Sequence, residues 1–215
     1  MPQLQLVLTD SFAALRTFTI NALAASKTPG GPEVIRKIEM LVENEKNKKA
    51  RAAALNFLVA TRDAKYEPLY QKFVNDSSYS VSAAALEGLS ALSPSTSYQL
   101  AKKYSTDAKG ALGSVVFYII MVNGTEADFD YVAKQYAAAP ATQEKLEMTA
   151  AYADYLEKLN DLTKIKRAID DIISFRALIP TQYRNVTDPV FKQSLDKVAK
   201  AKGAEIEKYI NEAFK

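Results

Sequence analysis

Apolar residues recur with a helical period along the first two thirds of the chain. Four segments align without gaps when they start at Asp10, Glu45, Asp76 and Asp107, with steps of 35, 31 and 31 residues. Apolar or small residues follow five, nine and thirteen positions later, which places them on one face of a helix. These residues are Leu15, Ala50, Val81 and Leu112; Thr19, Ala54, Ala85 and Val116; and Leu23, Leu58, Leu89 and Ile120. The pattern predicts a repeated, buried helix that begins near an acidic residue.

A second helix is predicted before each later copy. One apolar stripe consists of Val34, Ile35, Ile38, Leu41 and Val42, and the next of Tyr66, Leu69, Tyr70, Phe73 and Val74. Proline stands near the predicted helix starts, at positions 32, 68 and 94, where its missing N–H costs little. Thr125 and Asp128 have the spacing of a capping box. The repeating unit is therefore helix, turn, helix, turn.

Beyond position 140 the repeat becomes irregular. Helices are predicted over 142–159, about 161–179 and 189–214, with Asp188 as an N-cap and Pro189 at the first helical position. The segment 180–187 is predicted to be irregular. A terminal repeat that departs from the consensus is expected of a cap. We predict an all-α fold, an α-solenoid of HEAT-like antiparallel helix pairs in one domain over 1–215. Its repeats cover about 10–140, and a degenerate repeat and helical C-terminal cap cover about 141–215.

The first copy begins with the second type of helix and lacks a partner of the first type. We therefore expect the helix over 10–25 to expose an apolar strip, since its apolar side chains cannot all face one following helix pair. Phe12, Leu15 and Phe18 are candidates for an interdomain contact. An uncovered helix also suggests a piece of a longer protein. We expect the isolated chain to self-associate weakly or to rely on residues 1–8 as a cover.

The composition excludes several kinds of catalytic site. The 215 residues include neither histidine nor cysteine, so a Ser-His-Asp or Cys-His centre cannot form from this chain. A zinc site is not expected without imidazole or thiolate ligands. No catalytic residue, metal ligand or cofactor is therefore predicted in the chain. The sequence contains no run of about 18 apolar residues, so no membrane helix is predicted. The sequence does not distinguish between the cytoplasm and the periplasm.

A short basic run raises the question of nucleic-acid binding. It consists of Lys46, Lys48, Lys49 and Arg51. No aromatic residue interleaves the run, acidic residues precede it, and the net charge of the chain is only +3. These features favour a solvated helix start over a nucleic-acid contact.

One cluster near the predicted cap is a candidate for ligand contact. Arg176, Tyr183 and Arg184 flank or occupy the segment 180–187. Arginine suits bidentate recognition of carboxylates, so these residues are candidates for the wall of a substrate chamber. The structural alternative is that both arginines bind helix C-terminal carbonyls or nearby acids.

Several runs carry a family resemblance. They are Lys-Ala-Arg-Ala-Ala-Ala-Leu from Lys49, Asp-Ser-Ser-Tyr-Ser-Val-Ser-Ala-Ala-Ala-Leu-Glu-Gly-Leu from Asp76, Ala-Lys-Lys-Tyr from Ala101, Asp-Ala-Lys-Gly-Ala-Leu from Asp107 and Ile-Pro-Thr-Gln-Tyr-Arg from Ile179. With these runs the chain resembles the C-terminal HEAT-like helical domain of bacterial aminopeptidase N-like zinc metallopeptidases.

The resemblance implies a non-catalytic domain. That family carries its zinc motif, H-E-x-x-H with a distant Glu, and its G-x-M-E-N motif in an upstream catalytic domain, and neither motif occurs here. The implied role is to pack on the catalytic domain of the same polypeptide, whose cofactor is zinc, and to enclose the chamber for peptide substrates. The alternative is a stand-alone HEAT-like scaffold that binds a protein or nucleic acid.

Overall fold

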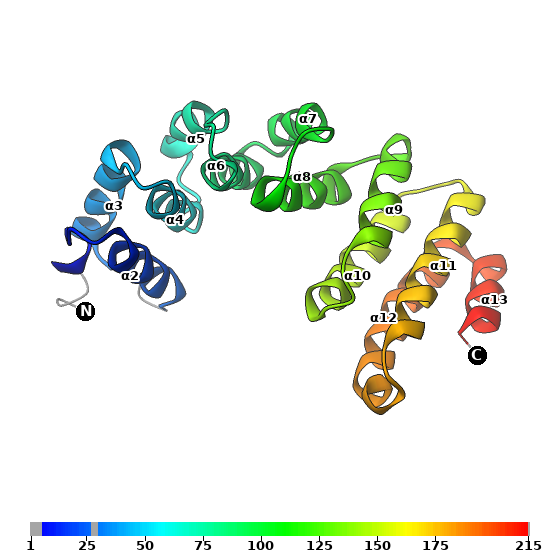
Figure 1. Ribbon diagram of the computed structural model, residues 1–215. Helices are drawn as coiled ribbons and strands as arrows, with labels where there is room; N and C mark the ends of the chain where they lie inside the picture. The colour runs from blue at the N-terminus through cyan, green and yellow to red at the C-terminus, as the bar shows by residue number, and fades with distance from the viewer. Residues whose placement is uncertain (1–5, 27–29, 215) are drawn as a thin grey trace. The chain divides into compact units, whose positions relative to one another are not determined.

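The computed structural model describes residues 6–26 and 30–214, and every regular element within them is helical (Figure 1). The first helices are α2 (Ala13–Ala25), α3 (Pro32–Asn44), α4 (Lys48–Val59), η1 (Ala64–Tyr66), α5 (Glu67–Phe73), α6 (Tyr79–Leu92), α7 (Pro94–Tyr104) and α8 (Gly110–Asn123). They are followed by η2 (Glu126–Asp128), α9 (Phe129–Ala138), α10 (Gln143–Leu156), α11 (Leu162–Leu178), η3 (Thr181–Tyr183), α12 (Arg184–Lys202) and α13 (Ala204–Ala213). The all-α prediction is confirmed for the described residues.

The chain divides into two compact units, residues 1–119 and 120–215, and the boundary falls within α8. We call them the first and the second unit and describe each by itself. The boundary lies about twenty residues before the position at which the sequence repeat becomes irregular. A single domain over 1–215 stays a prediction.

Helix pairs build the first unit. Helix α4 packs against α2 and α6, while α3 packs on α4, and both α5 and α7 pack on α6 (Figure 1). The six residues predicted to be buried on the repeated helix are all at most 2 % exposed, which confirms this assignment; they are Ala54, Leu58, Ala85, Leu89, Val116 and Ile120. Alanine at the central position of α4 and α6 leaves room for a close approach between backbones.

The contact between α5 and α6 requires a glycine. A Cβ atom at Gly88 would lie 2.4 Å from Cε1 of Tyr70, much closer than van der Waals contact. The Tyr70 ring therefore lies directly on the backbone of α6, and a larger residue at position 88 would displace it.

The acidic residues that begin the first three copies lie two positions before the N-cap of each helix. Asp10, Glu45 and Asp76 do not cap the helices themselves. Each accepts the backbone N–H of the residue two positions later, at 2.7, 2.8 and 2.8 Å, and that residue is the N-cap. The acids thus fix the turn that leads into each helix.

Aromatic side chains dominate the core of the second unit. Here α10 packs against α12, α9 against α11, and α13 against both α11 and α12. The rings of Tyr136 and Tyr152 stack with centroids 4.3 Å apart, and Phe175 meets Phe191 edge to face at 5.4 Å. The predicted capping box is confirmed, because Thr125 N–H donates to Asp128 at 2.9 Å where η2 leads into α9.

Two predicted helix boundaries in this unit were wrong. The segment 180–187 is not irregular, because η3 and the first turn of α12 occupy it. Asp188 therefore is no N-cap, and Pro189 lies inside α12, where it removes one hydrogen bond of the helix. The predicted helix 189–214 also ends at Gly203, whose φ of 83° suits glycine and separates α12 from α13.

Candidate functional site

The predicted apolar strip on the first helix is exposed. Phe12, Leu15 and Phe18 are 64 %, 44 % and 69 % exposed, whereas Thr19 and Leu23 on the same helix are buried. Helix α2 thus packs one of its faces against α4. Among the described residues, its other face is exposed to solvent. The interdomain role of the strip stays a prediction.

Equivalent positions in the next two copies show why this strip is unusual. Leu15 corresponds to Ala50 and Val81, and both of these are fully buried. Phe18 corresponds to Ala53 and Ala84, which are also buried. The face of α2 that carries Leu15 and Phe18 is therefore the face that α4 and α6 bury. In α4 and α6 the equivalent residues of this face are buried.

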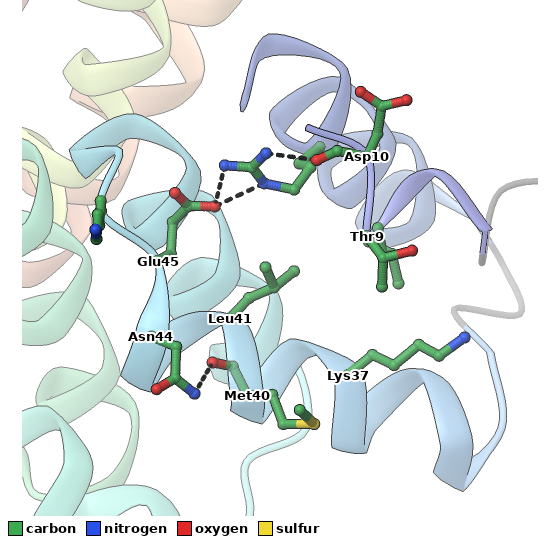
Figure 2. A pocket seen from close by; sticks show the side chains of 10 residues that line it. Thr9, Asp10, Lys37, Met40, Leu41, Asn44 and Glu45 are labelled. Atoms are coloured by element: carbon green, nitrogen blue, oxygen red, sulfur yellow. Dashed lines mark hydrogen bonds and ion pairs between the residues drawn. The ribbon is translucent and has the colours of Figure 1, made fainter. Parts of the chain in front are cut away.

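A hollow of about 440 Å³ lies beside the start of α2 (Figure 2). Its lining consists of Leu8, Thr9, Asp10, Arg16, Lys37, Met40, Leu41, Asn44, Glu45 and Lys46. Thr9 and Asp10 precede α2, while Met40, Leu41 and Asn44 belong to α3. Sequence analysis did not identify this hollow, because its two walls come from segments about thirty residues apart and neither has a distinctive motif.

A buried ion pair holds these two walls together. The guanidinium of Arg16 contacts Glu45 through Nε at 2.7 Å and Nη2 at 2.6 Å, and Nη1 donates to the Asp10 carbonyl at 2.6 Å. Burial by itself raises the pKa of Glu45, but the Asn47 N–H and the Arg16 guanidinium outweigh it and leave this pKa below its ordinary value. The pair is a structural feature of the hollow, since both partners satisfy each other.

The same pairing recurs one copy later. Arg51 occupies the position of Arg16 and lies 3.8 Å from Asp76, which begins the following copy. Lys48 binds the same carboxylate at 2.8 Å. Two cations of the basic run are thus engaged within the chain. That the run is no nucleic-acid site stays a prediction.

The structure places the arginines of the C-terminal cluster in structural contacts. Arg176 donates from Nε and Nη2 to the two carboxylate oxygens of Asp188, both at 2.8 Å, and its guanidinium lies 4.1 Å from the centroid of the Phe214 ring. Arg184 Nε donates to the Ile179 carbonyl at 3.3 Å. This is the arrangement expected of the structural alternative, and a substrate-chamber role for the two arginines stays a prediction.

Tyr183 differs from the two arginines, because its side chain is exposed. It lines a hollow of about 570 Å³ in the second unit together with exposed Leu178 and Val186. The other lining residues come from α10, α11 and α12 and from the segments beside them, among them Leu146, Phe175 and Val190. A substrate-chamber role for Tyr183 stays a prediction.

Sequence analysis also missed a buried lysine. Lys145 donates to the carbonyls of Ala137 and Ala139 at 3.3 and 3.0 Å, where α9 ends. Its Nζ lies 5.0 Å from the centroids of both the Tyr136 and the Phe175 ring. Burial lowers the pKa of Lys145. Lys145, which belongs to α10, thus caps the C-terminal end of α9. Nothing in the local sequence distinguishes it from a surface lysine.

Within residues 6–26 and 30–214, no group of three or more acidic side chains is placed to hold a metal ion. In the same ranges, no helix has both the length and the apolar character needed to cross a membrane. Comparison with protein families, with curated proteins and with solved structures finds no match to this chain.

Proposed function

We propose that this chain is a non-catalytic helical domain that docks on a protein through the exposed face of α2. One observation carries the proposal. Leu15 and Phe18 are exposed although the equivalent residues of α4 and α6 are buried by neighbouring helices. Apolar patches of this kind in soluble proteins commonly mark contact surfaces. A helix is the partner element that best complements this face.

The architecture in this proposal is an α-solenoid of HEAT-like helix pairs. Two features of the first unit support it. The repeated helices α2, α4 and α6 pack in sequence, and their buried positions recur at steps of 35 and 31 residues. In repeat arrays of this type each helix pair contacts its neighbours, so an uncovered end accepts a further helix.

The specific partner that we propose is the catalytic domain of a zinc aminopeptidase on the same polypeptide. The support is the family resemblance of the repeats together with the uncovered face of α2. In this arrangement the chain encloses the chamber for peptide substrates and leaves zinc binding and hydrolysis to the catalytic domain. The missing histidine and cysteine agree with that division of labour.

Antibodies against this chain, applied to extracts of cells that express it naturally, test the proposal. We expect them to detect a polypeptide much larger than the 23.7 kDa of this sequence. The precipitated protein should release amino acids from peptides, and a zinc chelator should stop the release. A band at 23.7 kDa without peptidase activity would contradict the proposal.

The alternative is a stand-alone HEAT-like scaffold that binds another protein. The same exposed face of α2 supports it, and it differs only in that the partner is a separate polypeptide. Binding of nucleic acid is not favoured, because Lys48 and Arg51 of the basic run already pair with Asp76. The size of the natural polypeptide distinguishes this alternative from the peptidase domain.

A further inference from the structure

A groove of about 390 Å³ lies within the first unit. Its lining comes from three of the repeated helices: Val59 of α4; Glu87, Ser90 and Ala91 of α6; and Ser114, Val115, Tyr118 and Ile119 of α8. Its volume is within the range of roughly 300–1,000 Å³ found for small-ligand pockets. The walls are mainly apolar or carry small hydroxyls, and Glu87 is the sole ionisable carboxylate among the lining residues.

Glu87 has no counter-ion in the described part of the chain. It forms neither a hydrogen bond nor an ion pair there. Its side chain reaches solvent, but the protein atoms around its carboxyl group remove enough water to raise its pKa, and no neighbouring cation offsets this effect. By contrast, the carboxylates of Glu45, Asp76 and Asp188 are each paired with a basic side chain. An uncompensated carboxylate in an apolar groove favours a positively charged ligand.

Tyr118 supplies a second element of cation recognition. It is 57 % exposed and lines the same groove. Glu87 and Tyr118 occupy equivalent positions of successive copies, eleven residues after Asp76 and Asp107, so both belong to one row of side chains along the repeated helices. A guanidinium can stack on a tyrosine ring and at the same time donate two hydrogen bonds to a carboxylate.

We propose that the groove lined by Glu87 and Tyr118 binds an arginine side chain of a peptide or unfolded protein segment. The carboxylate supplies the charge, the aromatic ring supplies the stacking surface, and Val59, Val115 and Ile119 line the space beside the aliphatic part of the side chain. Arginine is preferred to lysine because its planar group can stack flat on the ring while it donates two parallel hydrogen bonds to the carboxylate, whereas an ammonium offers a point charge. The inference does not rest on the peptidase proposal, since a scaffold could use the same groove.

The experiment is an NMR titration of the full chain, labelled with ¹⁵N, with the blocked tripeptide acetyl-Ala-Arg-Ala-amide. The control ligand is the same peptide with citrulline, which keeps the shape of arginine and lacks its charge. We expect saturable shifts of the amide signals of Glu87, Ser90 and Tyr118 with the arginine peptide. The citrulline peptide should bind at least about fivefold more weakly, which corresponds to the loss of one partly exposed charge contact.

Two variants separate the roles of the two residues. Glu87→Gln keeps the shape of the side chain and should weaken arginine binding about fivefold or more, while Tyr118→Leu keeps an apolar wall and should weaken it about threefold. Glu147→Gln changes an exposed carboxyl elsewhere and should leave binding unchanged. Equal binding of the citrulline peptide, unchanged affinity in Glu87→Gln, or shifts confined to other surface acids would overturn the inference. Preserved signal dispersion in each variant shows that it is folded.

Discussion

The two units of this chain achieve close helix packing with different side chains. In the first unit, alanines such as Ala54 and Ala85 lie between the repeated helices, and Gly88 accommodates the ring of Tyr70. In the second unit, stacked and edge-to-face rings of Tyr136, Tyr152, Phe175 and Phe191 fill the interior. Small residues let similar helices pack closely one after another. Large rings fill the spaces between helices of the second unit, where the sequence repeat becomes irregular.

The largest effect is expected when an aromatic ring is removed from the second unit. Phe191 is fully buried, so Phe191→Ala should lower the free energy of unfolding by about 3–5 kcal/mol through lost contacts and a cavity. Urea denaturation followed by tyrosine fluorescence measures this change. Val186→Ala, at an exposed position of the same helix, is the control and should cost less than about 0.5 kcal/mol.

In the first unit, the corresponding test removes a large side chain from the buried face of a repeated helix. Leu89 is fully buried in α6, and Leu89→Ala should cost about 2–5 kcal/mol in the same denaturation experiment. Met40→Ala, at an exposed position of α3, serves as the control. A loss below about half a kcal/mol for Leu89→Ala would show that this face contributes little to stability.

Adding volume tests whether small residues are required between the repeated helices. Ala85→Leu should lower the free energy of unfolding by about 1–3 kcal/mol, because the added atoms force neighbouring helices apart. Ala25→Leu adds the same atoms at an exposed position and should have little effect. If both variants are equally stable, alanine is not required for the close packing of α6 against its neighbours.

A smaller effect is expected at the ion pair between copies, and it depends on pH. Glu45→Gln should cost about 1–2 kcal/mol at pH 7, since the Arg16 guanidinium loses its charged partner. The pKa of Glu45 is lower in the folded protein than its ordinary value, so its contribution is complete above about pH 4.5 and decreases as the pH falls through the folded pKa. Denaturation at pH 7 and pH 3 should therefore show a smaller difference between wild type and variant at pH 3. An equal difference at both values would exclude the charge as the cause.

The smallest effect on stability is expected on the exposed face of α2. Phe18→Ser should change the free energy of unfolding by less than about 0.5 kcal/mol, because the ring is mostly in solvent. The same substitution should reduce weak self-association of the isolated chain, measured by sedimentation velocity at increasing concentration. Tyr79→Ser changes another exposed ring and is the control. A strictly monomeric wild type would contradict the expectation.

The sequence alone determined the helical fold of the repeats and the exposed strip. Each depends on the spacing of apolar residues along a helix, which is a local property of the chain. The buried set from Ala54 to Ile120 follows from comparing equivalent positions of successive copies. The exposure of Phe18 was expected for a different reason, because the first copy lacks a helix of the first type. The capping box at Thr125 was also predictable, because its two partners are three residues apart.

Only the tertiary structure decided what the charged and polar residues do. The sequence left open whether Arg176 meets a ligand or a nearby acid, and α12 begins early enough to place Asp188 against it. Lys145 terminates α9, and Glu87 and Tyr118 line one groove, through contacts between residues that have no fixed spacing in sequence. A charge acts on whatever lies within a few ångströms, and the packing of whole helices determines those neighbours. Hydrophobic periodicity therefore fixes which face of a helix is buried, while the partners of its polar groups depend on the final arrangement of several helices.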